Sequence, residues 1–236
     1  MNKTTKILMT SLIGIGLNAF TLSCSSSDNR DNVIGENYSI SPQNVTLNYD
    51  KTQQLSVRNG NTPVADFTWK SSDEKYGTIN KEGLLTAKKV GSFEVTATKN
   101  GKILKSNVTI VPYQTLFKEP GVDSFGKTMD EIKRQETRQL TLETPTGLGY
   151  KGENSNIESI IYIFDKDGKM QSVGVYFHSS TNSTDTVNKV TTFYKERYDV
   201  IGTTPDAIIF KHLNQPIKME MSVDPKLGLN VIYEKK

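Results

Sequence analysis

The sequence predicts two folded domains, an all-β sandwich followed by an α+β module in which an antiparallel sheet carries two helices. Residues 36–112 alternate apolar and polar side chains between short turn signals, which is the pattern of half-buried strands. Residues 113–236 mix such runs with two helical patterns. The hydrophobic content of 35% is low for one compact core of 236 residues. It suits two smaller units of roughly 100 residues each.

The amino terminus has the layout of an export signal. Residues 1–6 are short and basic, and residues 7–20 form an apolar run that is followed by small residues. This run is shorter than the roughly 20 residues that a membrane-spanning helix needs. We therefore expect a cleaved secretory signal peptide over residues 1–23.

The only cysteine of the chain, Cys24, follows this segment directly. Residues 21–24 (TLSC) resemble the lipobox of bacterial lipoproteins, in which a small residue precedes the cysteine that is acylated. Ser23 fits, whereas Thr21 occupies the usual place of the leucine. The resemblance implies a lipid attachment site at Cys24, with palmitate among its acyl chains. An ordinary signal peptide with an incidental cysteine is the alternative.

The polar residues 24–35 are then expected to be a flexible tether. Together with the lipobox, they predict a mature protein anchored in the outer membrane, on the cell surface or on the periplasmic face. Two or three acyl chains give stable attachment, whereas one would be marginal.

Composition excludes several classes of function. The net charge is +3, and without Lys3 and Lys6 of the signal segment the chain has 27 basic and 26 acidic residues. This balance provides no basic stripe for nucleic acid. A single cysteine excludes an intramolecular disulfide and a cysteine-based zinc site, and two histidines exclude a histidine-rich one. We expect no metal, no cofactor and no nucleic-acid partner.

Two sequence runs in residues 36–112 are specific. Residues 69–73 have the pattern W-x-S-S-D, and residues 83–91 have the pattern G-L-x-T-A-x-x-x-G. In this order they resemble the bacterial Ig-like group 2 family. The resemblance implies a small Ig-like sandwich, as found in adhesins and other surface proteins, often as a spacer. The alternating apolar residues of the module are Val45, Leu47, Tyr49, Leu55, Val57, Phe67, Trp69, Phe93, Val95, Ala97, Val108 and Ile110.

The single tryptophan of the chain, Trp69, lies in one of these alternating runs. We expect it to pack between the two sheets, with stacking on a sugar ring as the alternative. The neighbouring pair Asp73 and Glu74 is expected in a solvated turn, because calcium requires six or more oxygen ligands.

Residues 113–236 predict two units of α-β-β type that share one sheet, with both helices on one face. After a connector over residues 113–122, Thr128 and Glu131 form a capping box that opens a helix over about residues 128–138. A second helix is expected over residues 185–197. Strands are expected at residues 147–152, 157–164, 170–178, 207–213, 217–223 and 229–233. The unit beginning at residues 125–128 (FGKT) resembles the repeats of the β-lactamase-inhibitor-like fold, which also occur in outer-membrane lipoproteins.

Several polar residues of this module are candidates for chemistry. Asp165 and Asp167 resemble a fragment of a calcium loop, but the remaining ligands are missing and a hairpin turn is expected. His178 and His212 lie in predicted strands and are expected to be structural.

A carboxylate pair is the remaining catalytic candidate. Glu153, Glu158 and Asp165 could supply one only if two carboxyl groups lay about 5–10 Å apart. The sequence contains no metalloprotease, serine-hydrolase or phosphate-loop motif.

Thr186 is a candidate modification site. Residues 185–187 (DTV) resemble the O-glycosylation sequon of some gut Gram-negative bacteria, which implies a glycan on Thr186. The alternative is that Asp185 favours the dipole of the helix and Thr186 is simply exposed.

We therefore expect a lipid-anchored cell-envelope protein with a binding or adhesion role, not an enzyme. The Ig-like module would be a spacer, and the open sheet face of the second module would contact a protein or a glycan. This interpretation predicts exposed aromatic residues gathered in a patch, with Tyr150, Tyr176 and Tyr194 as candidates. The alternatives are a carboxylate-based polysaccharide hydrolase and an inhibitor or assembly factor.

Overall fold

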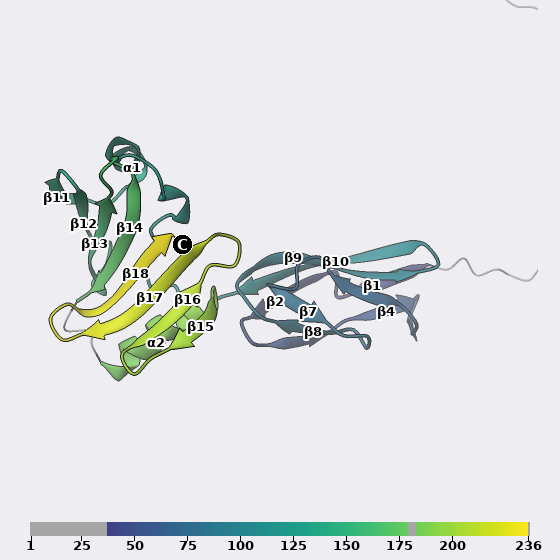
Figure 1. The fold of residues 1–236 in the computed structure, drawn as a ribbon. Coiled ribbons are helices and arrows are strands. Elements are labelled where there is room, and N and C mark those ends of the chain that lie inside the picture. Colours follow the sequence, from purple (N-terminus) through teal and green to yellow (C-terminus); the bar gives the residue numbers. More distant parts are fainter. Residues whose placement is uncertain (1–36, 179–182, 236) are drawn as a thin grey trace, which may run out of the picture. The chain divides into compact units, whose positions relative to one another are not determined.

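The computed structural model describes residues 37–178 and 183–235 (Figure 1). The expected signal peptide at 1–23, the attachment site Cys24 and the tether at 24–35 lie outside the described residues. No helix among the described residues is long and apolar enough to cross a membrane.

The described chain is mostly β, and its first part is an Ig-like sandwich. Three sheets form it, with the strand orders β1-β4-β5, β2-β10-β9-β6 and β3-β8-β7. The predicted alternation is confirmed, because Val95, Ala97, Val108 and Ile110 are each at most 1% exposed. Its strands are β1 (Tyr38–Ser41), β2 (Asn44–Asn48), β3 (Thr52–Gln54), β4 (Ser56–Asn59), β5 (Thr62–Val64), β6 (Thr68–Ser71), β7 (Gly77–Ile79), β8 (Leu84–Ala87), β9 (Gly91–Lys99) and β10 (Lys102–Val111).

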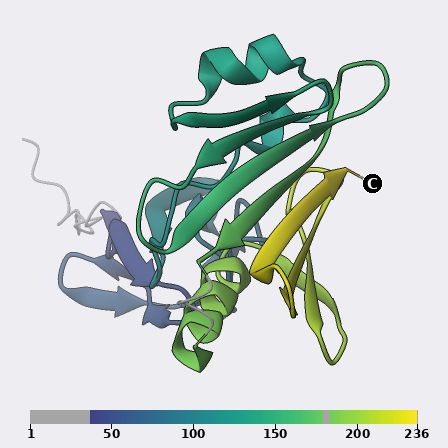
Figure 2. The ribbon, with the colours of Figure 1, turned by 90° about the vertical axis from the view of Figure 1, so that its left-hand side faces the viewer.

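A single sheet of eight antiparallel strands dominates the rest of the described chain. Its order is β11-β12-β13-β14-β18-β17-β16-β15, so two four-strand meanders meet where β14 pairs with β18. Figure 2 shows β14 and β18 side by side in the twisted sheet. The strands are β11 (Leu140–Thr144), β12 (Gly147–Lys151), β13 (Ile157–Phe164), β14 (Met170–Phe177), β15 (Asp199–Thr203), β16 (Ala207–Lys211), β17 (Ile217–Asp224) and β18 (Gly228–Lys235).

Each helix is followed by four strands, one more than the sequence predicted. The strands that were not predicted, β11 and β15, are the two edges of the sheet. Neither strand contains a buried residue. An edge strand that packs nothing into the core lacks the burial-driven alternation on which sequence prediction depends.

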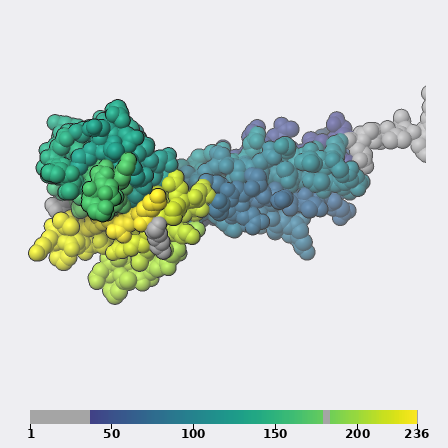
Figure 3. Space-filling model, turned by 45° about the horizontal axis from the view of Figure 1, so that its top comes forward, coloured from purple at the N-terminus to yellow at the C-terminus, as the bar shows by residue number. Residues whose placement is uncertain are grey.

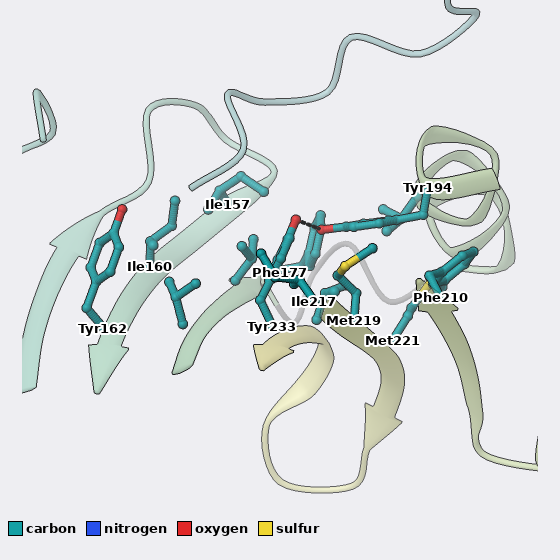
Figure 4. Close-up of a cluster of buried hydrophobic side chains, with 14 of the residues drawn as sticks. Ile157, Ile160, Tyr162, Phe177, Tyr194, Phe210, Ile217, Met219, Met221 and Tyr233 are labelled. Carbon is teal, nitrogen blue, oxygen red and sulfur yellow. Dashed lines mark hydrogen bonds between the residues drawn. The ribbon is translucent and has the colours of Figure 1, made fainter. Parts of the chain in front are cut away.

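Cross-strand register places the core side chains in rows. One row runs across six strands, and each of its members is at most 2% exposed. Figure 4 shows part of it beside helix α2. The row consists of Leu148, Tyr162, Val173, Tyr233, Met219 and Phe210.

Helix α1 (Met129–Gln135) begins as predicted, at the capping box of Thr128 and Glu131. The backbone N–H of Thr128 donates to the Glu131 carboxylate at 2.8 Å. The helix ends at Gln135 and not near 138, because Glu136 takes an extended backbone conformation. Its carboxylate is thereby free to accept hydrogen bonds from Tyr162 and Arg138.

Helix α2 (Thr184–Lys195) begins after Ser183, whose hydroxyl accepts a hydrogen bond from the backbone N–H of Thr186. It buries Val190, Phe193 and Tyr194 in the same core cluster that holds Ile132 of α1. In Figure 1, α2 lies behind strands β15–β17. One face of the sheet is therefore covered by helices and the other is open.

Truncations at Phe210 and Ile209 test this assignment of faces. Phe210 is fully buried, so Phe210→Ala should lower the free energy of unfolding by about 3–5 kcal/mol. Ile209 is its half-buried neighbour on the opposite face, so Ile209→Ala should lower the free energy of unfolding by only about 1 kcal/mol. Urea unfolding followed by circular dichroism measures both. Equal losses would contradict the assignment.

Candidate functional site

One row of residues runs across the middle of the open face of the eight-stranded sheet. Along each strand, its members alternate with residues that point into the core. Successive strand residues point to opposite faces, so each neighbour of a core-row residue belongs to the open face. The row is apolar except at Glu220, and two of its six positions are glycines. Its members are Gly149, Ile161, Gly174, Ile232, Glu220 and Ile209.

The glycines let neighbouring side chains lie flat on this face. A Cβ atom at Gly149 would lie 3.0 Å from Cβ of Leu142. A Cβ atom at Gly174 would lie 2.7 Å from the ring of Tyr176 and 3.0 Å from Cδ1 of Ile232. A glycine in a strand commonly marks such a close approach. The face therefore has a closely packed apolar strip between β11 and β18.

The apolar strip is open to solvent at its β11–β13 end, where Leu142 is 51% exposed and Ile163 is 38% exposed. The other half of the face is charged. Lys218 lies 3.1 Å from the Glu220 carboxylate and 3.8 Å from that of Glu234. Figure 3 shows the two halves of the sheet side by side, the first in teal and green and the second in yellow-green and yellow. An apolar strip beside paired charges is a surface suited to binding.

The predicted aromatic patch is wrong for two of its three members. Tyr150 is 3% exposed and Tyr194 is fully buried. Tyr150 is aligned with Ile160 in the core, and the Tyr194 hydroxyl lies 2.6 Å from that of Tyr233 (Figure 4). Of the three, only Tyr176 is placed on the open face, where it is half-buried.

On the core side, the connector is held by buried charges. Glu119 accepts hydrogen bonds from the hydroxyls of Tyr198 and Tyr233 at 2.9 and 2.8 Å. Arg197 lies 3.8 Å from the same carboxylate, which is 19% exposed. Burial raises the pKa of Glu119, and the hydrogen bonds from Tyr233 and Tyr198 and the charge of Arg197 offset only part of that rise. The fully buried Glu196 accepts the backbone N–H of Tyr113 at 2.8 Å.

A second buried cluster surrounds Arg138, whose side chain is 5% exposed. It donates to Glu136 at 2.8 Å and to Glu153 at 2.6 Å. Burial by itself would raise the pKa of Glu136, but hydrogen bonds from Tyr162 and from the backbone of Arg138, together with the charge of Arg138, outweigh it. The pKa of Glu136 therefore lies below its ordinary value.

The carboxylates of Glu119 and Glu136 line a small pocket. Both form hydrogen bonds or ion pairs with other side chains of the chain. Glu119, Glu136, Arg138 and Tyr162 border a cavity of about 250 Å³. Glu136 is neutralised by Arg138, and Glu119 is held by two tyrosine hydroxyls. A glycosidase needs one carboxyl to donate a proton and another to act as base or nucleophile on the substrate. Here Glu119 fixes the connector against the core, and Glu136 holds Arg138, which donates to the backbone carbonyl of Lys118 in the connector.

The acids expected from the sequence as a carboxylate pair have separate roles. Glu158 lies at the start of β13 and Asp165 follows its end, so about 20 Å of strand separates them. Glu153 is bound to Arg138. Asp165 accepts the backbone N–H groups of Asp167 and Lys169 at 2.9 and 2.8 Å, which confirms the predicted hairpin turn.

The remaining polar candidates lie in turns. His212 Nδ1 accepts the backbone N–H groups of Asn214 and Gln215 at 3.1 and 3.0 Å. Asp73 accepts the backbone N–H of Lys75 at 3.0 Å, as expected for a turn. Over residues 37–178 and 183–235, no three His, Cys, Asp or Glu residues gather in a way that could hold a metal ion.

Comparison with known proteins assigns the first module. Residues 36–110 match the family model of the bacterial Ig-like domain, group 2. The predicted resemblance is thereby confirmed for this module, which covers about a third of the chain. No curated protein sequence matches the chain.

Solved structures share only a low overall likeness with the chain. Domains 5–6 of the S-layer protein SbsC are 10% identical over 85% of this chain and 84% of that one, with a TM-score of 0.29. A tandem pair of titin Ig domains is 10% identical over 84% and 95%, with a TM-score of 0.26. The lipoprotein BT2262 from Bacteroides thetaiotaomicron is 7% identical over 84% and 100%, with a TM-score of 0.20.

In the Ig-like module, Trp69 packs against the core cluster opposite the buried Ala97, as the sequence predicted, but it is only half-buried and also lines a groove. Thr186 is also half-buried, and its hydroxyl lies 3.2 Å from that of Ser183 in the first turn of α2. Its glycosylation stays a prediction, as does acylation of Cys24, which lies outside the described residues.

Sequence reasoning missed the glycine-lined strip and the buried charges. A signal for the strip was present, because Gly147 and Gly149 alternate in one strand and Gly174 interrupts another. For Glu119 no local signal exists, since Tyr198 and Tyr233 come from distant parts of the chain, and for Arg138 only Glu136 is a near neighbour in the sequence.

Glu119→Gln should change how stability depends on pH. The raised pKa means that the folded state holds a proton which the unfolded state has already lost. The wild type therefore loses stability as pH rises from the ordinary carboxyl range through the raised value. Glutamine does not titrate, so the unfolding free energy of the wild type minus that of the variant should fall with rising pH.

Urea unfolding between pH 4 and pH 8 measures this difference. Glu158→Gln, which removes an exposed carboxyl outside the cluster, is the matched control. A difference that rises with pH for Glu119→Gln would show that the carboxylate is stabilised, not penalised, by its surroundings.

Proposed function

We propose that this chain is a lipid-anchored protein of the cell envelope with a non-catalytic binding or adhesion role. In this proposal the chain has two domains, and the Ig-like module is a spacer between the membrane and an α+β module at residues 113–236. The open face of the eight-stranded sheet is the contact surface for a protein or a glycan. Attachment through Cys24 and a glycan on Thr186 belong to the same proposal.

The single observation that carries this proposal is the partly exposed apolar strip on the face opposite the helices. The sheet already buries core side chains of six strands against two helices. A second apolar face is not needed for its stability. Nevertheless Leu142 and Ile163 remain exposed there, and the charged residues Lys218 and Glu220 lie on β17, on the other half of the same face. Specific interfaces commonly combine an apolar centre with a charged rim.

The contacts of the buried carboxylates support a binding role over hydrolysis. The raised pKa of Glu119 is the property that a catalytic acid would need. However, its oxygens face Tyr198, Tyr233 and Arg197, so a substrate would have to displace these partners. The same contacts fix the connector, which explains the cluster without catalysis.

Charged side chains introduced on the strip should weaken binding without unfolding the chain. Leu142→Glu combined with Ile163→Glu places two carboxylates on partly exposed positions of the strip. The readout is the affinity of the purified chain for immobilised envelope glycans and envelope proteins. We expect the double variant to bind at least tenfold more weakly, since a buried unpaired charge is costly.

Leu227→Glu is the matched control, because Leu227 is 56% exposed in the turn between β17 and β18 and lies off the strip. It should bind like the wild type. If the double variant keeps wild-type affinity for every immobilised ligand that the wild type retains, the open face is not the contact surface.

Cys24→Ser should release the protein from membranes. Without the cysteine no acyl chain can be attached at this position, and in this proposal the acyl chains hold the protein in the membrane. Fractionation of cells expressing either form measures the change from pellet to supernatant. Protease treatment of intact cells then locates the wild type: loss on intact cells indicates surface display, and survival until lysis indicates the periplasmic face.

A further inference from the structure

A groove on the Ig-like module is built around the only tryptophan of the chain. It has a volume of about 680 Å³, is open to solvent, and is bordered by Pro63, Phe67 and Trp69. This volume lies within the roughly 300–1,000 Å³ range of small-molecule sites. The groove lies on a different module from the open sheet face, so its role is independent of the proposed function.

Trp69 is held in place on one side and open on the other. Gly83 lies so close to its six-membered ring that a Cβ atom there would be 3.0 Å from Cζ2. Gly83 also has a φ of +81°, which suits glycine. The turn thus supports part of the indole, while the half-buried ring still lines the groove. An indole fixed in this way provides a rigid apolar platform.

Polar groups border the platform. Gln54 donates from its amide nitrogen to the backbone carbonyls of Leu55 and Glu82, at 2.8 and 2.7 Å. These bonds fix the amide and leave its oxygen as an acceptor. The exposed carboxylates of Asp66 and Glu82 also line the groove. Such acceptors bind hydroxyl groups readily.

The charges around the groove disfavour an ionic ligand. Lys81 and Glu82 form an exposed pair at 3.6 Å, and Asp66 adds one further carboxylate. The groove has no cluster of one sign that would attract a phosphate or a polybasic peptide. A peptide strand is disfavoured too, because Pro63 removes a backbone donor from β5, the edge strand at the groove. An uncharged ligand with many hydroxyl groups and an apolar ring face fits best.

We propose that this groove binds a neutral glycan, with one pyranose ring packed on Trp69. The apolar C–H face of the sugar would lie on the indole, and its hydroxyls would donate to Gln54, Asp66 and Glu82. The Ig-like module would then be a second contact site on the same chain, in addition to a spacer.

Titration of the full chain with neutral oligosaccharides tests this proposal. Because Trp69 is the only tryptophan, its fluorescence and its indole N–H resonance report on this groove alone. The probes are cellohexaose, xylohexaose, mannohexaose and maltohexaose. We expect at least one of them to give a saturable change in both signals, with millimolar affinity. No change with any of the four would overturn the proposal, and so would a change produced only by a charged oligosaccharide or a peptide.

Two surface variants distinguish contact from indirect effects. Gln54→Ala and Glu82→Gln remove exposed partners and should weaken binding at least threefold each, and Glu82→Gln should leave the indole resonance of the free chain in place. Glu74→Gln removes an exposed carboxyl outside the groove and should have no effect. Equal affinity of all three variants would overturn the proposed contacts, and calorimetry on Trp69→Phe should show weakened binding if the indole is the platform.

Discussion

The pairing of β14 with β18 is the constraint on which the eight-stranded sheet depends. Five residue pairs, from Ser172 with Glu234 to Tyr176 with Asn230, join two meanders into one sheet. The pairing brings Val173 beside Tyr233, so the core rows of the two halves become continuous. Since side chains alternate between faces, the same register also aligns Gly174 with Ile232 on the open face. A slip of one residue would exchange the two faces, so the core and the candidate contact surface are set by one interaction.

Buried charged side chains then hold the connector that precedes the sheet in the sequence. The connector at 113–122 contributes Glu119 to the hydroxyls of Tyr198 and Tyr233, and Glu196 accepts its backbone N–H groups. A buried charge whose partner is removed is strongly destabilising, so these contacts specify one arrangement of the chain. The connector is thus part of the core structure, although its composition resembles that of a loop.

The open face and the tryptophan groove share one physical feature. In both, a glycine removes a side chain and lets a larger neighbour lie flat beside an apolar surface: Gly174 beneath Tyr176, and Gly83 beneath Trp69. Leu142 and Ile163 on the open face are exposed, whereas Trp69 is half-buried and packs against the core of its own module. At both places apolar surface remains in contact with solvent, and this is the basis for proposing binding at each.

The sequence by itself determined the Ig-like module, the capping box at Thr128, the hairpin turn at Asp165 and most of the strands, because these depend on neighbouring residues. Local patterns also placed both helices to within a few residues. Only the tertiary structure decided that β11 and β15 join the sheet, that Tyr150 and Tyr194 are buried and that Glu119 meets Tyr233. Edge strands carry no burial pattern, an aromatic residue looks the same on either face of a strand, and the hydrogen bond from Tyr233 to Glu119 joins residues far apart in the chain. Such features are fixed by register and packing, which a sequence pattern does not record.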